Sequence, residues 1–161
     1  MKKLLFFTCL LGFCFQCTEK DVSSTNSGDN TTAVIEEAVI SPDEEAIEAV
    51  IQLYFDGWLT GDTTLVGQAM HKSCHLKFVR DGKIDLRNRN QYLSGFKPRP
   101  RLENAEGRII DIDITRTAAE AQIELETENR LFTDYFNLLK EGSRWYITDK
   151  VSTSIDKKQN G

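Results

Sequence analysis

The stretch LFTDYFNLLKEGSRWYITDKVSTS, residues 131–154, decides the fold class of this chain. Apolar and polar residues alternate in both halves of the stretch, and Glu141-Gly142-Ser143 separates the halves. Alternation with a period of two is typical of β-strands with one buried face, and a short glycine-containing connection is typical of a hairpin. The sequence therefore predicts a hairpin of two long strands, over residues 131–140 and 144–153.

Further strands precede this hairpin. Isoleucines alternate with aspartates over residues 110–114, and alanine or aliphatic residues alternate with Glu or Gln over residues 119–126. The second pattern is so strongly amphipathic that one face of the sheet must be in water. Residues 74–86 also show a period of two and contain Asp81-Gly82, a typical hairpin turn. These patterns predict a sheet built mainly from hairpins.

Two helices are predicted before the strands. Ser41 has the position of an N-cap, with Pro42 at the first helical position and Glu44 completing a capping box. Gly61 ends this helix, and a second, shorter helix follows over residues 62–70. The first helix carries apolar residues at helical spacing, namely Ile47, Val50, Ile51, Tyr54, Phe55, Trp58 and Leu59.

The N-terminal residues resemble a bacterial lipoprotein leader. Lys2-Lys3 precede an apolar run over residues 4–15, which is too short to span a bilayer because spanning takes roughly 20 apolar residues. The run ends near Cys17, where polar residues begin. We expect residues 1–17 to be a signal peptide, with Cys17 lipidated and the protein exported and anchored to a membrane of the cell envelope. The alternatives are lipidation at Cys14 and a buried N-terminal helix.

The rest of the chain divides into a tether, one domain and a tail. Residues 18–32 are almost entirely polar, and such a segment buries too little apolar surface to offset the entropy of ordering it. We expect a polar tether over residues 18–40, a domain over 41–154 and a C-terminal tail over 155–161. The net charge of −5 and the absence of a clustered basic surface argue against a nucleic-acid partner.

The C-terminal hairpin also carries a family motif. The motif consists of Phe132-Thr133-Asp134-Tyr135, Leu138-Leu139, Gly142, Trp145, Ile147 and Lys150, with His71 after the second predicted helix. It resembles the putative lumazine-binding branch of the nuclear transport factor 2-like superfamily. The resemblance implies an α+β cone, with N-terminal helices packed in a strongly curved antiparallel sheet and a pocket at the open end. It implies little about chemistry, because that superfamily includes isomerases, dehydratases, cyclases and members without known activity.

Two aspartates of the hairpin are candidate catalytic residues. Strict alternation places Asp134 and Asp149 on the same side of the sheet, opposite each other or one step apart. Two close carboxylates in apolar surroundings raise the pKa of one of them, which suits proton transfer. The alternatives are that this end of the face is wet, that a β-bulge turns one aspartate outward, or that Asp134 forms an ion pair with Lys150 or an arginine.

His71 is the third candidate acid or base, and a structural contact in a loop is its alternative role. His71 and His75 have the spacing of two zinc ligands on a helix, but they lie where helix gives way to strand and lack an obvious third ligand. We therefore expect no metal and no cofactor. Cys74 has no cysteine partner in the domain and is not expected to be catalytic.

Aromatic residues are the candidate contacts for a flat ligand, although those on the first helix equally suit the core. The candidates are Tyr54, Phe55, Trp58, Phe78, Phe132, Phe136 and Trp145. Since no complete catalytic set is visible, we expect a non-catalytic module that binds a small hydrophobic or aromatic molecule or forms a homodimer through its sheet face. The alternatives are an acid–base enzyme of the isomerase, dehydratase or cyclase type, which would use Asp134, Asp149 and His71, and a purely structural envelope protein.

Overall fold

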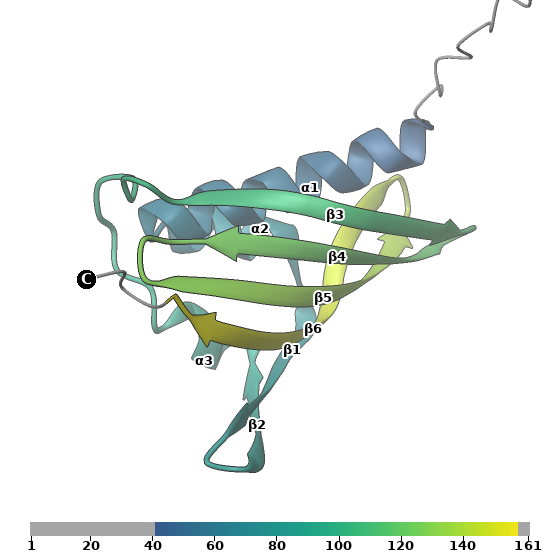
Figure 1. Cartoon of the computed structure of the whole chain (residues 1–161). Helices are drawn as coiled ribbons and strands as arrows, with labels where there is room; N and C mark the ends of the chain where they lie inside the picture. Colours follow the sequence, from purple (N-terminus) through teal and green to yellow (C-terminus); the bar gives the residue numbers. More distant parts are fainter. Residues whose placement is uncertain (1–40, 158–161) are drawn as a thin grey trace, which may run out of the picture. The chain divides into compact units, whose positions relative to one another are not determined.

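The computed structural model describes residues 41–157, so the predicted signal peptide, Cys14, Cys17 and the tether lie outside the described residues. The elements in chain order are α1 (Pro42–Thr60), α2 (Thr63–Ala69), β1 (Met70–Arg80), β2 (Lys83–Asn88), α3 (Arg89–Leu93), β3 (Glu106–Thr115), β4 (Ala118–Glu126), β5 (Arg130–Glu141) and β6 (Arg144–Asp156). Two helices precede the strands and the short α3 lies between β2 and β3, which confirms the predicted α+β class (Figure 1).

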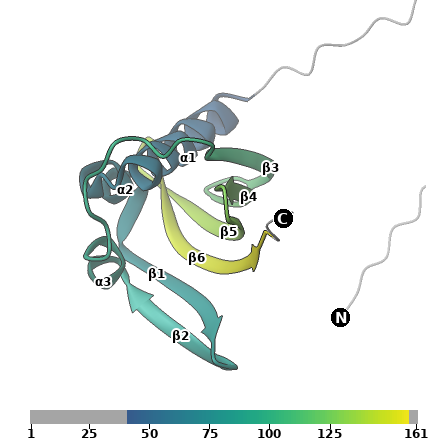
Figure 2. The ribbon, with the colours of Figure 1, turned by 60° about the vertical axis from the view of Figure 1, so that its left-hand side comes forward.

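The six strands form one curved sheet in the order β2-β1-β6-β5-β4-β3. Every neighbouring pair is antiparallel except β1 and β6, which run parallel, so the expected antiparallel sheet contains one parallel pair. Helix α1 lies across one face of the sheet, and the β1–β2 hairpin projects away from the other strands (Figures 1 and 2). The sheet and helices thus form the predicted cone.

The helix ends follow the predicted capping residues. The hydroxyl of Ser41 accepts a hydrogen bond from the backbone N–H of Glu44 at 3.1 Å, and Gly61 ends α1 with a positive φ of 68°. Asp62 caps α2, which ends at Ala69, one residue earlier than predicted, because Met70 already belongs to β1. Within residues 41–157, no helix combines the length and the apolar character needed to cross a membrane.

The core lies between α1 and the concave face of the sheet. At its edge, a Cβ added to Gly107 of β3 would lie 2.3 Å from the Phe55 ring, so this strand approaches the helix more closely than any other residue type would allow. The largest fully buried side chains include Trp145, Tyr54, Phe136, Ile47, Ile51, Leu59, Ile123, Leu125, Leu138 and Ile147.

Two β-bulges change which side chains face this core. In β6, Ile147 pairs with Leu138 and Asp149 pairs with Asn137, which leaves Thr148 as an extra residue. In β3, the register shifts between Ile109 and Asp111, and Ile110 is 48% exposed rather than in line with Ile112 and Ile114 as expected. A bulge reverses the alternation of the strand after it.

Candidate functional site

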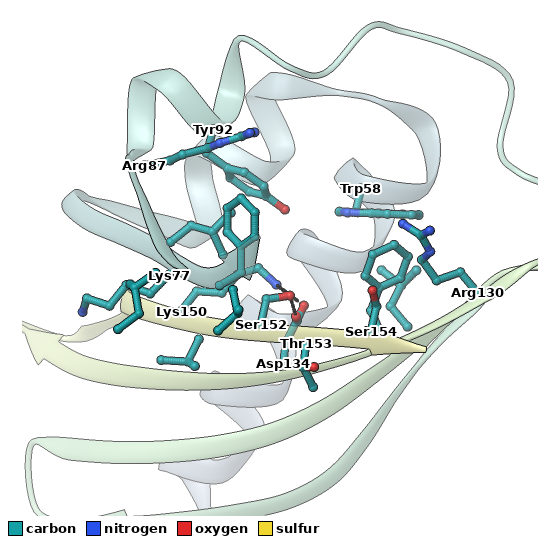
Figure 3. Close-up of a pocket in the computed structure, with 17 residues that line it drawn as sticks. Trp58, Lys77, Arg87, Tyr92, Arg130, Asp134, Lys150, Ser152, Thr153 and Ser154 are labelled. Carbon is teal, nitrogen blue, oxygen red and sulfur yellow. Dashed lines mark hydrogen bonds and ion pairs between the residues drawn. The ribbon is translucent and has the colours of Figure 1, made fainter. Parts of the chain in front are cut away.

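A cavity of about 720 Å³ opens beside the projecting β1–β2 hairpin (Figure 3). Its size falls in the range of roughly 300–1,000 Å³ that is typical of small-molecule pockets. The lining residues are Trp58, Leu76, Lys77, Phe78, Val79, Ile84, Arg87, Tyr92, Leu125, Arg130, Phe132, Asp134, Lys150, Val151, Ser152, Thr153 and Ser154.

The cavity exists because two paired strands separate. Strand β1 pairs with β6 only as far as Phe78 and Ser152. Beyond this point β1 turns into its hairpin with β2, while β6 continues along β5 to Asp156. The diverging strands form two walls, and the end of α1 with Trp58 and the helix α3 with Tyr92 form the others.

A buried polar cluster forms the floor of the cavity. Asp134 and Lys150 form an ion pair, and they are only 2% and 3% exposed. The Ser152 hydroxyl donates a hydrogen bond to Asp134 Oδ1 at 2.5 Å and lies 3.5 Å from Lys150 Nζ. Figure 3 shows these three side chains close together, with Asp134 on β5 and Lys150 and Ser152 on the neighbouring β6. Each charge is therefore neutralised and hydrogen-bonded by the protein itself, as a buried charge requires.

Aromatic rings surround the Lys150 amine. Lys150 Nζ lies 5.5 Å from the ring centre of Tyr54 and 5.6 Å from that of Phe136, distances at which a cation interacts with a ring face. Burial lowers the pKa of Lys150, and the neighbouring Asp134 carboxylate opposes this shift. The hydroxyls of Tyr54 and Tyr92 share a hydrogen bond of 2.7 Å, and burial raises the pKa of both phenols, which therefore stay protonated.

The mouth of the cavity combines aromatic faces with arginines. Trp58 packs edge-to-face on Phe132 with ring centres 5.5 Å apart, and the Arg130 guanidinium lies 5.8 Å from the Phe132 ring centre. On the opposite wall, the Arg87 guanidinium lies 5.2 Å from the Phe78 ring centre. A flat, largely apolar molecule therefore meets ring faces on two walls and polar groups on the floor.

The structure separates the predicted ligand contacts into two groups. Trp58, Phe78 and Phe132 line the cavity. The other four do not line it, because they point into the core beneath it or at the far end of the sheet; these are Tyr54, Phe55, Phe136 and Trp145. Trp145, for example, donates from its indole N–H to Asp43 Oδ1 at 3.0 Å near the start of α1.

The predicted pairing of Asp134 with Asp149 is wrong. The bulge at Thr148 reverses the alternation of β6, so Lys150 and Ser152 join Asp134 while Asp149 turns to the other face and forms an ion pair with Lys77. The Thr148 hydroxyl donates to the Asn137 carbonyl at 3.0 Å and so satisfies a backbone acceptor at the bulge. Of the three alternatives stated for this pair, the structure shows two, the bulge and the Asp134–Lys150 ion pair.

The predicted acid–base trio is not assembled. His71 does not line the cavity, and its Nδ1 lies 2.7 Å from the Ser73 hydroxyl. Among residues 41–157, no group of three or more His, Cys, Asp or Glu side chains is placed to hold a metal ion. Cys74 is fully buried, and burial raises the pKa of its thiol to about 12, so the reactive thiolate is disfavoured there.

Several cavity residues were not predicted as site residues. Lys150 and Ser152 follow the bulge, and strand alternation counted from Trp145 assigns them to the outer face. The sequence signals for Lys150 were its place in the family motif and its proposed ion pair with Asp134. Tyr92 lines the cavity from the five-residue helix α3. This helix belongs to the segment that connects two strands, and the sequence of that segment has no periodic pattern that would place Tyr92 at the cavity.

Comparisons with known proteins place the chain in a family. Residues 42–152 match the family described as "Putative lumazine-binding". A search among curated proteins found no relative of this chain.

Solved structures share the fold. A nuclear transport factor 2-like protein of unknown function from Shewanella baltica OS155 is 28% identical, with a TM-score of 0.65 over 70% of this chain and 94% of that one. Another, from Methylobacillus flagellatus KT, is 27% identical, with a TM-score of 0.60 over 71% and 94%. A ketosteroid isomerase-like protein from Erwinia carotovora atroseptica SCRI1043 is 12% identical, with a TM-score of 0.57 over 71% and 98%, and shows likeness of fold alone. With its fold and most of its length matched, the chain belongs to the putative lumazine-binding family of nuclear transport factor 2-like proteins.

Proposed function

We propose that the domain binds a small, flat and largely apolar molecule in the 720 Å³ cavity and does not catalyse its conversion into a product. The observation that carries this proposal is the combination of ring-lined walls with one buried polar cluster, Asp134–Lys150–Ser152. Pockets of this composition bind through apolar contact and use a few polar groups to fix the orientation of the ligand. The family description names lumazine, a heteroaromatic molecule whose flat shape suits these walls.

The floor cluster suits a ligand with a polar edge. An ammonium carries three N–H donors, and within residues 41–157 Lys150 Nζ has Asp134 and Ser152 as its oxygen partners. A carbonyl oxygen or ring nitrogen at the ligand edge can accept the remaining donor. The polar edge of the ligand would then lie on the floor, with its apolar body between Trp58 and Phe78.

Acid–base catalysis is the second candidate function, because Asp134 is a carboxylate that lines the cavity. It is less well supported, since Lys150 and Ser152 already bond this carboxylate and neither Asp149 nor His71 lies beside it. If Asp134→Asn leaves ligand affinity and any turnover unchanged, the catalytic alternative built on this residue fails.

Calorimetric titration with 2-naphthalenemethanol, a neutral flat probe, tests the binding proposal. Phe132→Ala removes a ring from the cavity wall, whereas Tyr135→Ala removes an exposed ring three positions along the same strand and outside the cavity. We expect the first variant to lose at least about tenfold in affinity, equivalent to about 1.4 kcal/mol, and the second to bind as the original chain does. Equal effects of the two variants would contradict the proposed site.

Export and lipid anchoring are a separate part of the proposal, supported by the leader-like residues 1–17 and the polar residues after them. The domain would then act within reach of a membrane of the cell envelope. Cys17→Ser should abolish metabolic labelling of the chain with a radioactive fatty acid. Labelling that persists in this variant and disappears in Cys14→Ser would move the lipid to Cys14.

Self-association is supported by exposed apolar side chains on the outer face of β5 and β6. Tyr135 and Val151 are register partners there and are 51% and 44% exposed, with Leu139 and Ile155 exposed on the same two strands. A second copy that covers these residues would form the expected homodimer. Sedimentation of Tyr135→Glu compared with the original chain tests this: loss of a dimer supports it, and a chain that is monomeric from the outset contradicts it.

A further inference from the structure

The buried lysine on the cavity floor is placed for covalent chemistry as well as for hydrogen bonding. We infer that Lys150 forms a reversible imine with an aldehyde or ketone held in the cavity. This inference rests on the proposed binding function and narrows its ligand to carbonyl compounds with a flat apolar body.

The surroundings of the amine carry the inference. Lys150 lines the cavity and is only 3% exposed, so its side chain is largely desolvated while it remains in contact with the cavity. Lysines that form imines are typically held in such apolar sites, where desolvation favours the neutral, nucleophilic amine. The burial of Lys150 provides this environment, and the pKa of Lys150, which burial lowers against the opposing effect of Asp134, agrees with it.

Asp134 supplies the proton transfers that the reaction needs. It first accepts a proton from the Lys150 ammonium, which leaves a neutral amine whose lone pair attacks the carbonyl carbon. A proton moves from nitrogen to the former carbonyl oxygen and gives a carbinolamine. Asp134 then returns its proton to this hydroxyl, the C–O bond breaks, water leaves and a protonated imine remains. One carbonyl compound is consumed, one water is released, and the net charge of the site does not change.

The other lysines of the described domain lack this environment. Lys140 also forms an ion pair, with Asp43, but its side chain is 27% exposed and it does not line the cavity. Lys77 lines the cavity, yet its side chain is 42% exposed and pairs with Asp149. Imine formation near neutral pH should therefore select Lys150.

Reductive trapping with 2-naphthaldehyde and sodium cyanoborohydride at pH 6.5 tests the inference, with peptide mass spectrometry to locate the naphthylmethyl group. We expect at least roughly tenfold more label on Lys150 than on any other lysine, because an aldehyde bound in the cavity is held beside this amine and proximity of two reacting groups accelerates their reaction by far more than this factor. Because the label is located in the unaltered chain, this result does not depend on whether a variant folds.

Two variants serve as matched controls. Lys150→Arg keeps the charge beside Asp134 and removes the primary amine, so it should lose the cavity label, whereas Lys140→Arg should keep it. Label spread over surface lysines with Lys150 unmodified, or undiminished total label in Lys150→Arg, would overturn the inference. Titration with 2-naphthalenemethanol, which cannot form an imine, distinguishes failure of the imine inference from failure of the binding proposal. Binding of this alcohol without trapping of the aldehyde refutes the imine alone. Absence of both binding and trapping refutes the proposed function as well.

Discussion

Removal of the Lys150 charge should show how much the buried ion pair of Asp134 and Lys150 contributes to the free energy of unfolding. Lys150→Met leaves the Asp134 carboxylate without its cation at a position that is 2% exposed. Loss of one member of a buried ion pair typically costs about 3–5 kcal/mol, because the remaining charge is uncompensated in apolar surroundings. The Ser152 hydroxyl still donates to Asp134, so we expect a loss near the lower end, about 3 kcal/mol in the free energy of unfolding.

The double variant separates the cost of an orphaned charge from the net contribution of the pair. When both partners of a buried ion pair become apolar, the change is often neutral or stabilising, since neither charge has to be desolvated. Asp134→Leu combined with Lys150→Met should therefore recover most of the loss, to within about 1 kcal/mol of the original chain.

Urea unfolding at pH 7, followed by tryptophan fluorescence, measures the free energy of unfolding of both variants. The comparison is valid if the slope of this free energy against urea concentration is unchanged. Lys140→Met is the matched control, because its ion pair with Asp43 has side chains that are 27% and 36% exposed. Partly exposed pairs contribute at most about 1 kcal/mol. A Lys150→Met loss no larger than that of Lys140→Met would refute the reasoning that the Asp134–Lys150 pair is desolvated.

Two further predictions concern the core. Gly107→Ala places a methyl group 2.3 Å from the Phe55 ring and should lower the free energy of unfolding by about 1–3 kcal/mol. Gly95→Ala is the control and should have little effect, because the added methyl group lies 3.4 Å from its nearest neighbouring atom. Equal melting temperatures for the two variants would contradict the predicted clash. Because the pKa of Cys74 is about 12 in the folded chain against 9.0 for an ordinary thiol, the unfolded chain releases this proton first as pH rises. The contribution of Cys74 to stability should therefore be complete below pH 9 and decline from pH 9 to 12, while iodoacetamide should label Cys74 at pH 8 only after unfolding.

The order and type of the elements could be predicted because local patterns encode them. Ser41 and Gly61 mark the ends of α1, and alternating residues mark the long strands. The sheet class followed from these patterns and from the family motif. The parallel pairing of β1 with β6 could not be predicted, because no turn or spacing in the sequence marks which strands meet across the sheet.

The candidate site was predicted only in part, because one extra residue controls its composition. Alternation correctly placed Phe132 and Asp134 on the inner face of β5. Alternation failed on β6 after Thr148, because a threonine in a strand gives no local signal of a bulge. The residues on either side of Thr148 pair with two consecutive residues of β5, which leaves Thr148 as the extra residue. The bulge exchanged Asp149 for Lys150 and so replaced an expected pair of carboxylates with an ion pair. This exchange places an ion pair on the cavity floor where two carboxylates were predicted.

The most direct test of the proposed cavity is a titration of the isotopically labelled chain with 2-naphthalenemethanol, observed through its backbone amide resonances. Binding in the cavity predicts saturable shifts at Leu76, Leu125 and Ser152, which line it. The amides of Glu120 and Asn137, which lie in a separate groove, should not move. Shifts confined to Glu120 and Asn137, or no shifts at millimolar probe, would contradict the account.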